Sequence, residues 1–244
     1  MKKILVINPN TSLEMTNEIR STIERIQDKN IKTITISPDF GATSLESFYD
    51  YALASFAIIR LLNQLKKQNQ NFDGILISCF GDPGLYAIKE ISAIPVIGIA
   101  EASMSISLLM GQKFSLLVAS KKAVPMMRDM VNQYSLTSRL ASIETLNLNV
   151  LDVEQNKQDS IQKLILAGKQ AIDKGAEVLI LGCAGMTNMQ SEVAQTLNIP
   201  VIDPVEYGYK VLETMVKNNF PISKIGLYMK PYTKDILQKD LLSI

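Results

Sequence analysis

The sequence predicts an α/β protein built from two pseudo-symmetric, Rossmann-like halves, each with a parallel sheet. Short apolar runs alternate with longer stretches of helical periodicity, which is typical of β-strands joined by α-helices. Several of the runs are apolar on both faces, as in parallel sheets covered by helices. The chain also resembles itself, because "ILISCFG" from Ile75 matches "LILGCAG" from Leu179, and "IPVIGIAE" from Ile94 matches "IPVIDPVE" from Ile199.

The expected elements follow one another along the whole chain. We expect strands at Lys3–Asn8, Lys32–Ser37, Gly74–Cys79, Pro95–Ile99, Phe114–Ala119, Leu140–Leu148, Glu177–Cys183, Pro200–Ile202 and Ile225–Tyr228. We expect helices at Leu13–Gln27, Leu45–Lys67, Glu101–Met110, Lys121–Tyr134, Glu154–Lys174, Met189–Leu197, Val205–Lys217 and Tyr232–Leu242.

The internal match divides the chain into parts. We expect a first α/β half over residues 1–111, a second over residues 112–207, and a C-terminal segment, residues 208–244, that packs back on the first half. Ligands of parallel α/β sheets bind outside the carboxyl ends of the strands. We therefore expect the active site in the cleft between the halves.

Composition excludes several classes of function. The formal net charge of the 244-residue chain is +1, which gives no electrostatic reason to expect nucleic acid or a membrane surface as a partner. No apolar run approaches the roughly 20 residues of a membrane span, and the apolar part of the N-terminus is too short for a signal peptide. We therefore expect a cytoplasmic protein. The absence of histidine excludes Ser-His-Asp and Cys-His arrangements and His-based zinc sites.

The only two cysteines, Cys79 and Cys183, occupy matched positions at the ends of two predicted strands. Asp82 and Pro83 predict a helix cap and a first helical residue after Cys79. Thr187 or Asn188 is the expected cap after Cys183. A thiol at a helix N-terminus faces unpaired N–H groups, which favour the thiolate.

Two thiols on opposite sides of one carbon suit racemisation. One thiolate removes a proton from a stereocentre while the other thiol delivers a proton to the opposite face. Backbone N–H groups beside the cysteines would stabilise the enolate oxygen. Three alternatives remain open: two buried structural cysteines, a redox disulfide without a Cys-x-x-Cys motif, and a single nucleophile without its usual histidine.

Two further loops are expected at the same sheet edge. In "NPNTSLEMT" after the first strand, Asn10 or Thr11 is the expected helix cap, and Thr11-x-x-Glu14 fits a capping box. Asn8 either hydrogen-bonds a ligand or only shapes the turn, and the internal match makes Ser120 its counterpart. In "FGATSLESFYD", Thr43 or Ser44 is the expected cap, and either hydroxyl is a candidate ligand contact. No GxGxxG or P-loop pattern is present.

The motifs "ILVINPNTS", "FGATSLESFYDYALA", "CFGDPGLYAIKE", "IPVIGIAEAS", "LILGCAGM" and "IPVIDPVEYG" together resemble the hydantoin racemase branch of the aspartate/glutamate racemase superfamily, which includes hydantoin and allantoin racemases. The resemblance covers Ile4 to about Gly208. It implies a cofactor-independent racemase, a cyclic ureide or imide as substrate and a homo-oligomer. Cys79 and Cys183 fall on the catalytic pair. Asn8, Gly81, Ser120, Ala184 and Gly185 fall on loops that surround the ligand in the family. With Ser44 and Phe80 they form the expected substrate-binding set, and no metal is expected.

Two other functions remain open. The first is racemisation of a free acidic amino acid such as aspartate or glutamate, which calls for cationic groups near the substrate; Lys121 and Lys122 lie close to a predicted site loop. The second is a non-catalytic protein that binds a metabolite in the cleft.

Overall fold

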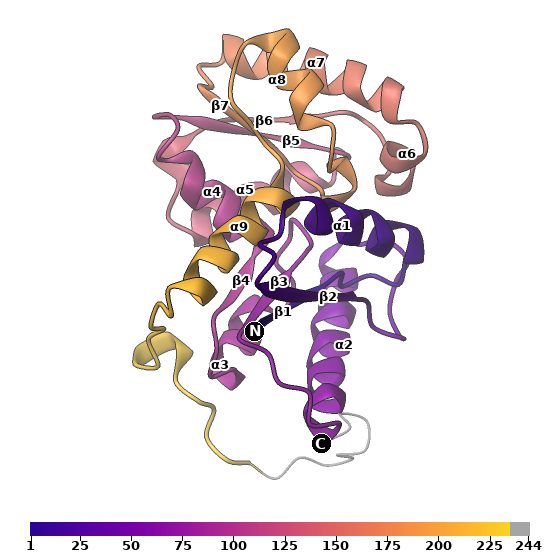
Figure 1. The fold of residues 1–244 in the computed structure, drawn as a ribbon. Helices are drawn as coiled ribbons and strands as arrows, with labels where there is room; N and C mark the ends of the chain where they lie inside the picture. The colour runs from indigo at the N-terminus through magenta and orange to yellow at the C-terminus, as the bar shows by residue number, and fades with distance from the viewer. Residues whose placement is uncertain (235–244) are drawn as a thin grey trace. The chain divides into compact units, whose positions relative to one another are not determined.

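The computed structural model describes residues 1–234 and all of their side chains except that of Glu154. These residues form two parallel four-stranded sheets with the orders β2-β1-β3-β4 and β6-β5-β7-β8. The two orders are the same once the strands of each sheet are numbered from its first strand. The predicted α/β class with two similar halves is therefore confirmed (Figure 1).

Chain contacts divide the protein into two compact units. Unit 1 comprises Met1–Ser78, Asp82–Gly98 and the described residues from Tyr209 onward, and unit 2 comprises Cys79–Gly81 and Ile99–Gly208. Each unit holds one sheet. The helix that follows the last strand of the first sheet therefore belongs to unit 2.

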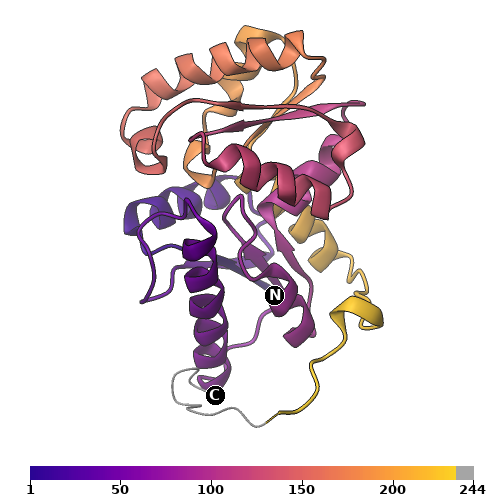
Figure 2. The same ribbon diagram turned by 180° about the vertical axis from the view of Figure 1, so that it is seen from behind.

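Unit 1 places helices on both faces of its sheet. Leu5, Ile7 and Ile77 pack on one face against the second and third helices of the chain. Figure 2 shows α1 and α2 on opposite faces of this sheet. The elements are β1 (Lys2–Ile7), α1 (Leu13–Ile26), β2 (Ile31–Ile36), α2 (Phe48–Lys67), β3 (Gly74–Ile77), α3 (Leu85–Ile91) and β4 (Val96–Gly98).

Unit 2 repeats the same layers. Leu117, Leu179 and Leu181 pack against α7 and α8 on one face, and Figure 1 shows α4 and α5 on the other. The elements are α4 (Ile99–Ser107), β5 (Phe114–Val118), α5 (Ala123–Gln133), η1 (Thr137–Arg139), β6 (Leu140–Thr145), α6 (Val150–Gln155), α7 (Lys157–Asp173), β7 (Val178–Leu181), η2 (Ala184–Met186), α8 (Gln190–Leu197) and β8 (Val201–Ile202). Helix α9 (Pro204–Lys217) begins in unit 2 and ends in unit 1.

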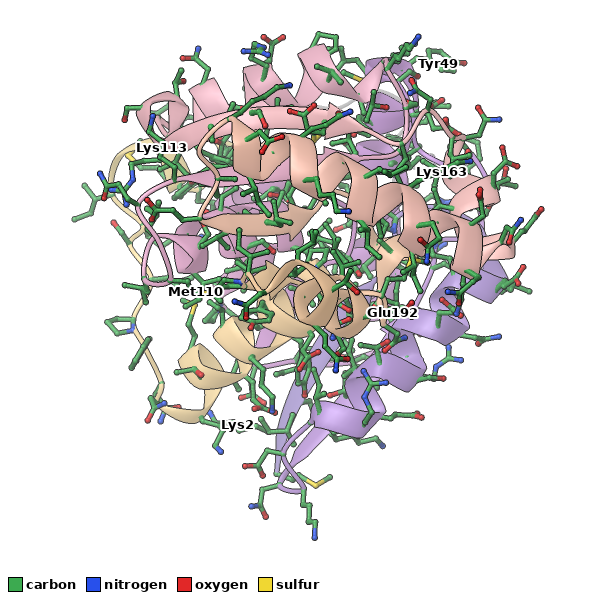
Figure 3. All side chains as sticks on the ribbon, turned by 90° about the horizontal axis from the view of Figure 1, so that it is seen from above. Lys2, Tyr49, Met110, Lys113, Lys163 and Glu192 are labelled. Atoms are coloured by element: carbon green, nitrogen blue, oxygen red, sulfur yellow. The ribbon has the colours of Figure 1, made fainter. Side chains whose placement is uncertain are left out.

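The outer surface of the α7–α8 layer is polar. Lys163 of α7 forms an ion pair with Asp159 one turn earlier, at 2.6 Å. Gln158 donates a hydrogen bond to the carboxylate of Glu192 on α8, at 3.3 Å. Figure 3 shows Lys163 and Glu192 on this layer of helices.

Several predicted boundaries are wrong. Strand β6 is confirmed, but Ile225–Tyr228 is not a strand: Gly226 has a φ of +78°, and Gly226–Tyr228 form a short 3-10 helix, η3. The predicted helix Glu154–Lys174 is two helices, because Asn156 leaves the helical region with a φ of −128°. Of the predicted helix Tyr232–Leu242, the residues from 235 onward lie outside the described residues, and 232–234 are not helical.

Two predicted N-cap residues are also wrong. Ser12, and neither Asn10 nor Thr11, caps α1 by accepting a hydrogen bond from the Met15 amide. The Asn10 side chain instead accepts from the Ser12 amide, which leaves Ser12 at the cap position. Helix α2 begins three residues later than expected, because Ser47 accepts from the Asp50 amide and donates to the Asp50 carboxylate.

No helix within residues 1–234 has the length and apolar character needed to cross a membrane.

Candidate active site

Both cysteines lie two residues beyond the end of a central strand. Strand β3 ends at Ile77 and β7 ends at Leu181, so Cys79 and Cys183 occupy equivalent positions in the two sheets. Neither cysteine forms a disulfide, and each is partly exposed. Neither thiol is therefore a deeply buried strand residue.

The two cysteine loops belong to the same compact unit. Cys79–Gly81 separate from β3 and group with unit 2, which also contains Cys183. Five of the seven predicted binding residues are in this unit: Phe80, Gly81, Ser120, Ala184 and Gly185. The other two, Asn8 and Ser44, are in unit 1.

The Cys183 sulfur faces a backbone donor. The amide of Gly185 donates to Sγ at 3.4 Å, and Cys183 precedes the three residues of η2. An N–H directed at sulfur stabilises the thiolate more than the neutral thiol. The predicted capping by Thr187 or Asn188 is wrong, because α8 begins only at Gln190. Both residues instead donate to the Asp203 carboxylate.

The turn after Cys79 differs from the predicted helix start. Asp82 has a φ of +44° and Gly84 a φ of +73°, and Asp82 carbonyl oxygen accepts from the Leu85 amide at 3.1 Å. Helix α3 begins at Leu85 with Gly84 at its cap position. Asp82 is therefore not the N-cap and Pro83 is not the first helical residue, because two left-handed residues form a separate turn between the cysteine and the helix.

Asn8 is fully buried at the end of β1, and its amide group has a defined orientation. Nδ2 donates to Asn10 Oδ1 at 2.7 Å and to Thr16 Oγ1 at 2.9 Å. Since Thr16 donates its own proton to the Ser12 carbonyl, Thr16 acts as the acceptor for Asn8. These bonds hold the Asn8 side chain within the turn that follows β1. Its Oδ1 has no hydrogen-bond partner among the described residues.

The remaining predicted contacts occupy turns. Ser44 donates to Glu46 Oε1 at 2.9 Å and does not cap α2. Ser120 Oγ accepts from the Ala123 amide at 3.4 Å, just before α5.

The strand register corrects the predicted match between the halves. Ile7 pairs with Ile77 as Leu117 pairs with Leu181. Ser120 lies three residues after Leu117, so its counterpart is Asn10, three residues after Ile7, and not Asn8.

Tyr207 of unit 2 is disfavoured as a general base. Burial raises the pKa of Tyr207, and the charges of Glu206 and Asp203 raise that pKa further. The phenol therefore stays protonated at neutral pH. Within residues 1–234, no group of three or more Cys, Asp or Glu side chains is arranged to hold a metal ion.

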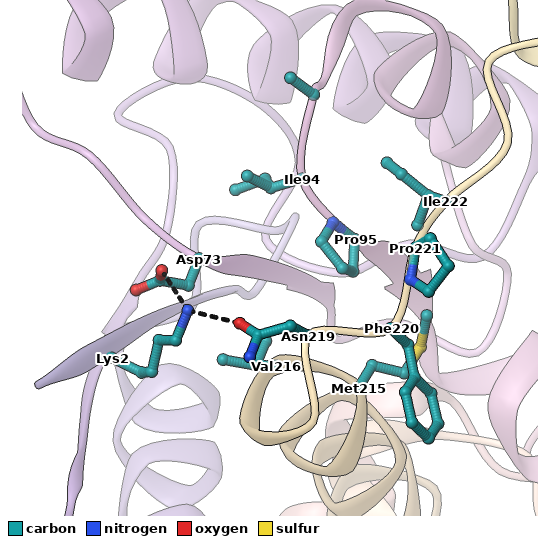
Figure 4. Close-up of a pocket in the computed structure, with 11 residues that line it drawn as sticks. Lys2, Asp73, Ile94, Pro95, Met215, Val216, Asn219, Phe220, Pro221 and Ile222 are labelled. Atoms are coloured by element: carbon teal, nitrogen blue, oxygen red, sulfur yellow. Dashed lines mark hydrogen bonds and ion pairs between the residues drawn. The ribbon is translucent and has the colours of Figure 1, made fainter.

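A pocket of about 350 Å³ lies in unit 1 at the opposite edge of the sheet. Lys2, Asp73 and Pro95 line it, each at or just before the start of a strand. Figure 4 shows the Lys2 amine between Asp73 and Asn219, at 3.3 and 2.9 Å. Ligands of parallel sheets bind at the carboxyl ends of the strands. This pocket lies at the amino ends, so it is not the expected position of an active site.

The family can now be assigned from comparisons with known proteins. A family model described as Asp/Glu/Hydantoin racemase matches residues 4–212. The chain belongs to this family. Its relatives include a hydantoin racemase from Paenarthrobacter aurescens, which is 35% identical over 96% of this chain and 100% of its own length.

Solved structures of family members share the whole fold. An allantoin racemase from Klebsiella pneumoniae is 31% identical, covers 99% of both chains and has a TM-score of 0.92. An allantoin racemase from Pseudomonas fluorescens is 27% identical, covers 96% of this chain and 99% of its own, and has a TM-score of 0.90. The resemblance in the sequence motifs is thereby confirmed.

Proposed function

We propose that this chain is a cofactor-independent racemase of 5-substituted hydantoins, with allantoin among the candidate substrates. The observation that carries the proposal is the pair of partly exposed thiols at equivalent positions beyond β3 and β7, in a chain of the racemase family. The similarity to proteins named hydantoin racemase and allantoin racemase supports the substrate class.

The proposed reaction exchanges one proton for another at the ring carbon. The thiolate of one cysteine takes the proton from C5, and the electron pair of the broken C–H bond moves into the adjacent carbonyl to form an enolate. The thiol of the other cysteine then protonates C5 from the opposite face. Cys79 and Cys183 exchange roles for the opposite enantiomer, so no oxidant, metal or cofactor enters the balance.

The polar groups near the strand ends suit a cyclic ureide. The side-chain oxygen of Asn8 has no hydrogen-bond partner within residues 1–234, and such an acceptor complements a ring N–H of a hydantoin. A free acidic amino acid would bring a second carboxylate and call for a cation. Lys121 and Lys122 are both solvent-exposed in the turn before α5, which favours the ureide.

Single enantiomers of 5-substituted hydantoins, allantoin, aspartate and glutamate test the substrate class. Loss of optical rotation is followed with and without protein, because hydantoins also racemise spontaneously. We expect loss of rotation on the ureides only. Activity on aspartate or glutamate alone would instead assign the amino-acid function. Binding without loss of rotation would identify a metabolite-binding protein.

Cys79→Ser and Cys183→Ser test the two thiols. A serine hydroxyl does not form the required base at neutral pH, so each change should lower the racemisation rate by at least about 100-fold while the melting temperature stays near that of the wild type. Each single variant should still exchange C5–H for solvent deuterium from one enantiomer, and the two variants should prefer opposite enantiomers. Full racemase activity in either variant would refute the two-thiol mechanism.

A cytoplasmic location and a homo-oligomeric assembly are part of the same proposal. Cell fractionation tests the first, and light scattering on the purified chain tests the second.

A further inference from the structure

Asp203 is fully buried and accepts four hydrogen bonds. One carboxylate oxygen accepts from the Val205 and Glu206 amides at 2.9 and 3.3 Å, which caps α9. The other oxygen accepts from the Thr187 hydroxyl at 2.7 Å and the Asn188 amide at 2.9 Å. A buried carboxylate is stable as an anion when such donors surround it.

These bonds fix the Cys183 loop to a helix. Cys183 leads into η2, and Thr187 follows η2 directly. The segment from Cys183 to Asn188 is thus held at its far end by Asp203. The hydroxyl of Thr187 is fully buried at this junction. A shift of the carboxylate therefore moves the backbone that orients the Cys183 sulfur.

The Cys79 loop has a buried carboxylate of its own. Asp82 lies three residues after Cys79, is 7% exposed and adopts a φ of +44°. A Cβ added to Gly98 would lie only 2.1 Å from Asp82 Oδ1, so this carboxylate covers the position that a side chain of residue 98 would take. Gly98 is the last residue of β4 and precedes the N-terminus of α4.

The two acids lie next to equivalent positions of the two sheets. In the first sheet, Gly98 pairs with Ile77, two residues before Cys79. In the second sheet Ile180 pairs with Ile202, so the next step of the register sets Asp203 beside Leu181, two residues before Cys183. Residues 98 and 203 are therefore equivalent. In the first sheet the acid follows the cysteine on the same loop, and in the second sheet it directly follows the last strand, which ends at Ile202.

We infer that Asp82 and Asp203 are positioning residues, Asp82 for Cys79 and Asp203 for Cys183. This inference rests on the proposed function. The Asp203 carboxylate connects the Cys183 loop to the start of α9, and the Asp82 carboxylate, which follows Cys79 by three residues, packs over Gly98 at the end of β4. Each thereby restricts the sulfur to the direction from which it reaches the substrate carbon.

Asp203→Asn is the most selective variant. Asparagine keeps one acceptor oxygen, which can still cap α9, but its NH₂ group replaces the other oxygen and cannot accept a hydrogen bond from the Asn188 amide. Asp203→Asn is combined in turn with Cys79→Ser and with Cys183→Ser, so that each double variant keeps a single thiol. The exchange of C5–H for solvent deuterium is then measured for each. With Cys79→Ser, where only Cys183 remains, Asp203→Asn should lower exchange roughly 10- to 100-fold. With Cys183→Ser, it should leave exchange unchanged.

Asp82→Asn should give the mirror result, and so should Gly98→Ala, whose methyl group displaces the Asp82 carboxylate. Both should lower exchange only where Cys79 is the remaining thiol. Loss of stability alone would lower exchange equally in both backgrounds, and that result would overturn the inference. So would unchanged exchange in both backgrounds.

Two further variants provide a milder test of Asp203 and a control. Thr187→Val removes one of the four hydrogen bonds with little change of volume, so it tests Asp203 even if Asp203→Asn does not fold, and it should act in the same background to a smaller extent. Glu206→Gln is the matched control. Its carboxylate accepts from the Gln190 side chain at 3.1 Å, which joins the starts of α8 and α9, and it takes no part in the hydrogen bonds of the Asp203 carboxylate, so exchange should not change.

A readout without substrate separates this inference from the proposed function. Alkylation by iodoacetamide at about pH 10, above the usual thiol pKa of roughly 8.5, reports access to each sulfur. Asp203→Asn should speed alkylation of Cys183 and leave Cys79 unchanged, as resolved by peptide mass spectrometry. Failure of the wild type to racemise any substrate would refute the function. Equal alkylation changes at both thiols would refute the positioning roles.

Discussion

The residue before each cysteine meets a different environment at otherwise equivalent positions. Gly182 precedes Cys183, and a Cβ there would lie 2.8 Å from the Leu117 carbonyl oxygen and 2.8 Å from a methyl group of Val118. The Gly182 amide also donates to that same carbonyl at 2.7 Å. Ser78 precedes Cys79 and carries a side chain without such a clash. The close approach of two strand ends thus limits which residue stands beside Cys183.

Gly182→Ala should therefore disturb the Cys183 loop. The methyl group meets backbone that cannot move aside easily, so we expect a loss of about 1–3 kcal/mol in the free energy of unfolding and a lower racemisation rate. Urea unfolding and polarimetry measure the two effects. Ser78→Ala is the matched control. Its buried hydroxyl has no hydrogen-bond partner among the described residues, so its loss should cost little. Equal effects of both changes would contradict this account.

At the scale of elements, the C-terminal half of α9 completes the core of unit 1. Leu212 and Val216 pack on Gly74, where an added Cβ would come within 2.9 and 2.7 Å of them. The buried Tyr209 shares a hydrogen bond of 2.8 Å with Thr33 on β2. Burial raises the pKa of the Tyr209 phenol to about 12 from an ordinary value of 10.0, although the Thr33 bond opposes the shift.

Tyr209→Phe should change the response to alkaline pH. Because the pKa of Tyr209 is higher in the folded state, its stabilisation is complete below pH 10.0 and is lost as pH rises from 10.0 to about 12. Over that range the wild type should lose about 1.4 kcal/mol per pH unit more than the variant. Near pH 7 the variant should be less stable by about 1 kcal/mol, through loss of the Thr33 bond. Urea unfolding across this range measures the difference, and a constant difference would contradict the shift.

At the scale of the whole molecule, unit 1 is not continuous in sequence. Met1–Gly98 contribute its four strands, apart from the loop Cys79–Gly81, but the helix that covers Gly74 comes from beyond Gly208. Unit 2 needs only Ile99–Gly208 and the Cys79 loop. A single continuous fragment therefore contains nearly all of unit 2, whereas no single fragment contains all of the core of unit 1.

Fragments test this difference. Residues 99–208 should unfold cooperatively on heating, as followed by circular dichroism at a helix wavelength. Residues 1–98 should not, because one face of their sheet lacks Tyr209, Leu212 and Val216. Joining residues 209–234 to residue 98 through a Gly/Ser linker should restore a cooperative transition. Cooperative unfolding of residues 1–98 alone would show that α9 is not required.

Periodicity and repetition in the sequence were sufficient for the α/β fold class, for the matched positions of the two cysteines, and for eight of the nine predicted strands, all of which fall within residues 1–234. Buried strands and amphipathic helices depend on local patterns of apolar residues, which one sequence displays directly. The exact caps were not predictable in the same way. Ser, Thr, Asn and Asp compete for each helix start, and the choice of Ser12 and Ser47 depends on which side chain is already engaged elsewhere.

What the sequence by itself determined about this protein is its α/β architecture, its two similar halves and its pair of matched thiols. Only the tertiary structure decided that the Cys79 loop groups with unit 2, that the side-chain oxygen of Asn8 has no hydrogen-bond partner among residues 1–234, and that Asp82 packs over Gly98 while Asp203 accepts from Thr187. The reason is physical: hydrogen bonds between residues far apart in the chain depend on strand register and close packing, and neither is visible in local sequence patterns.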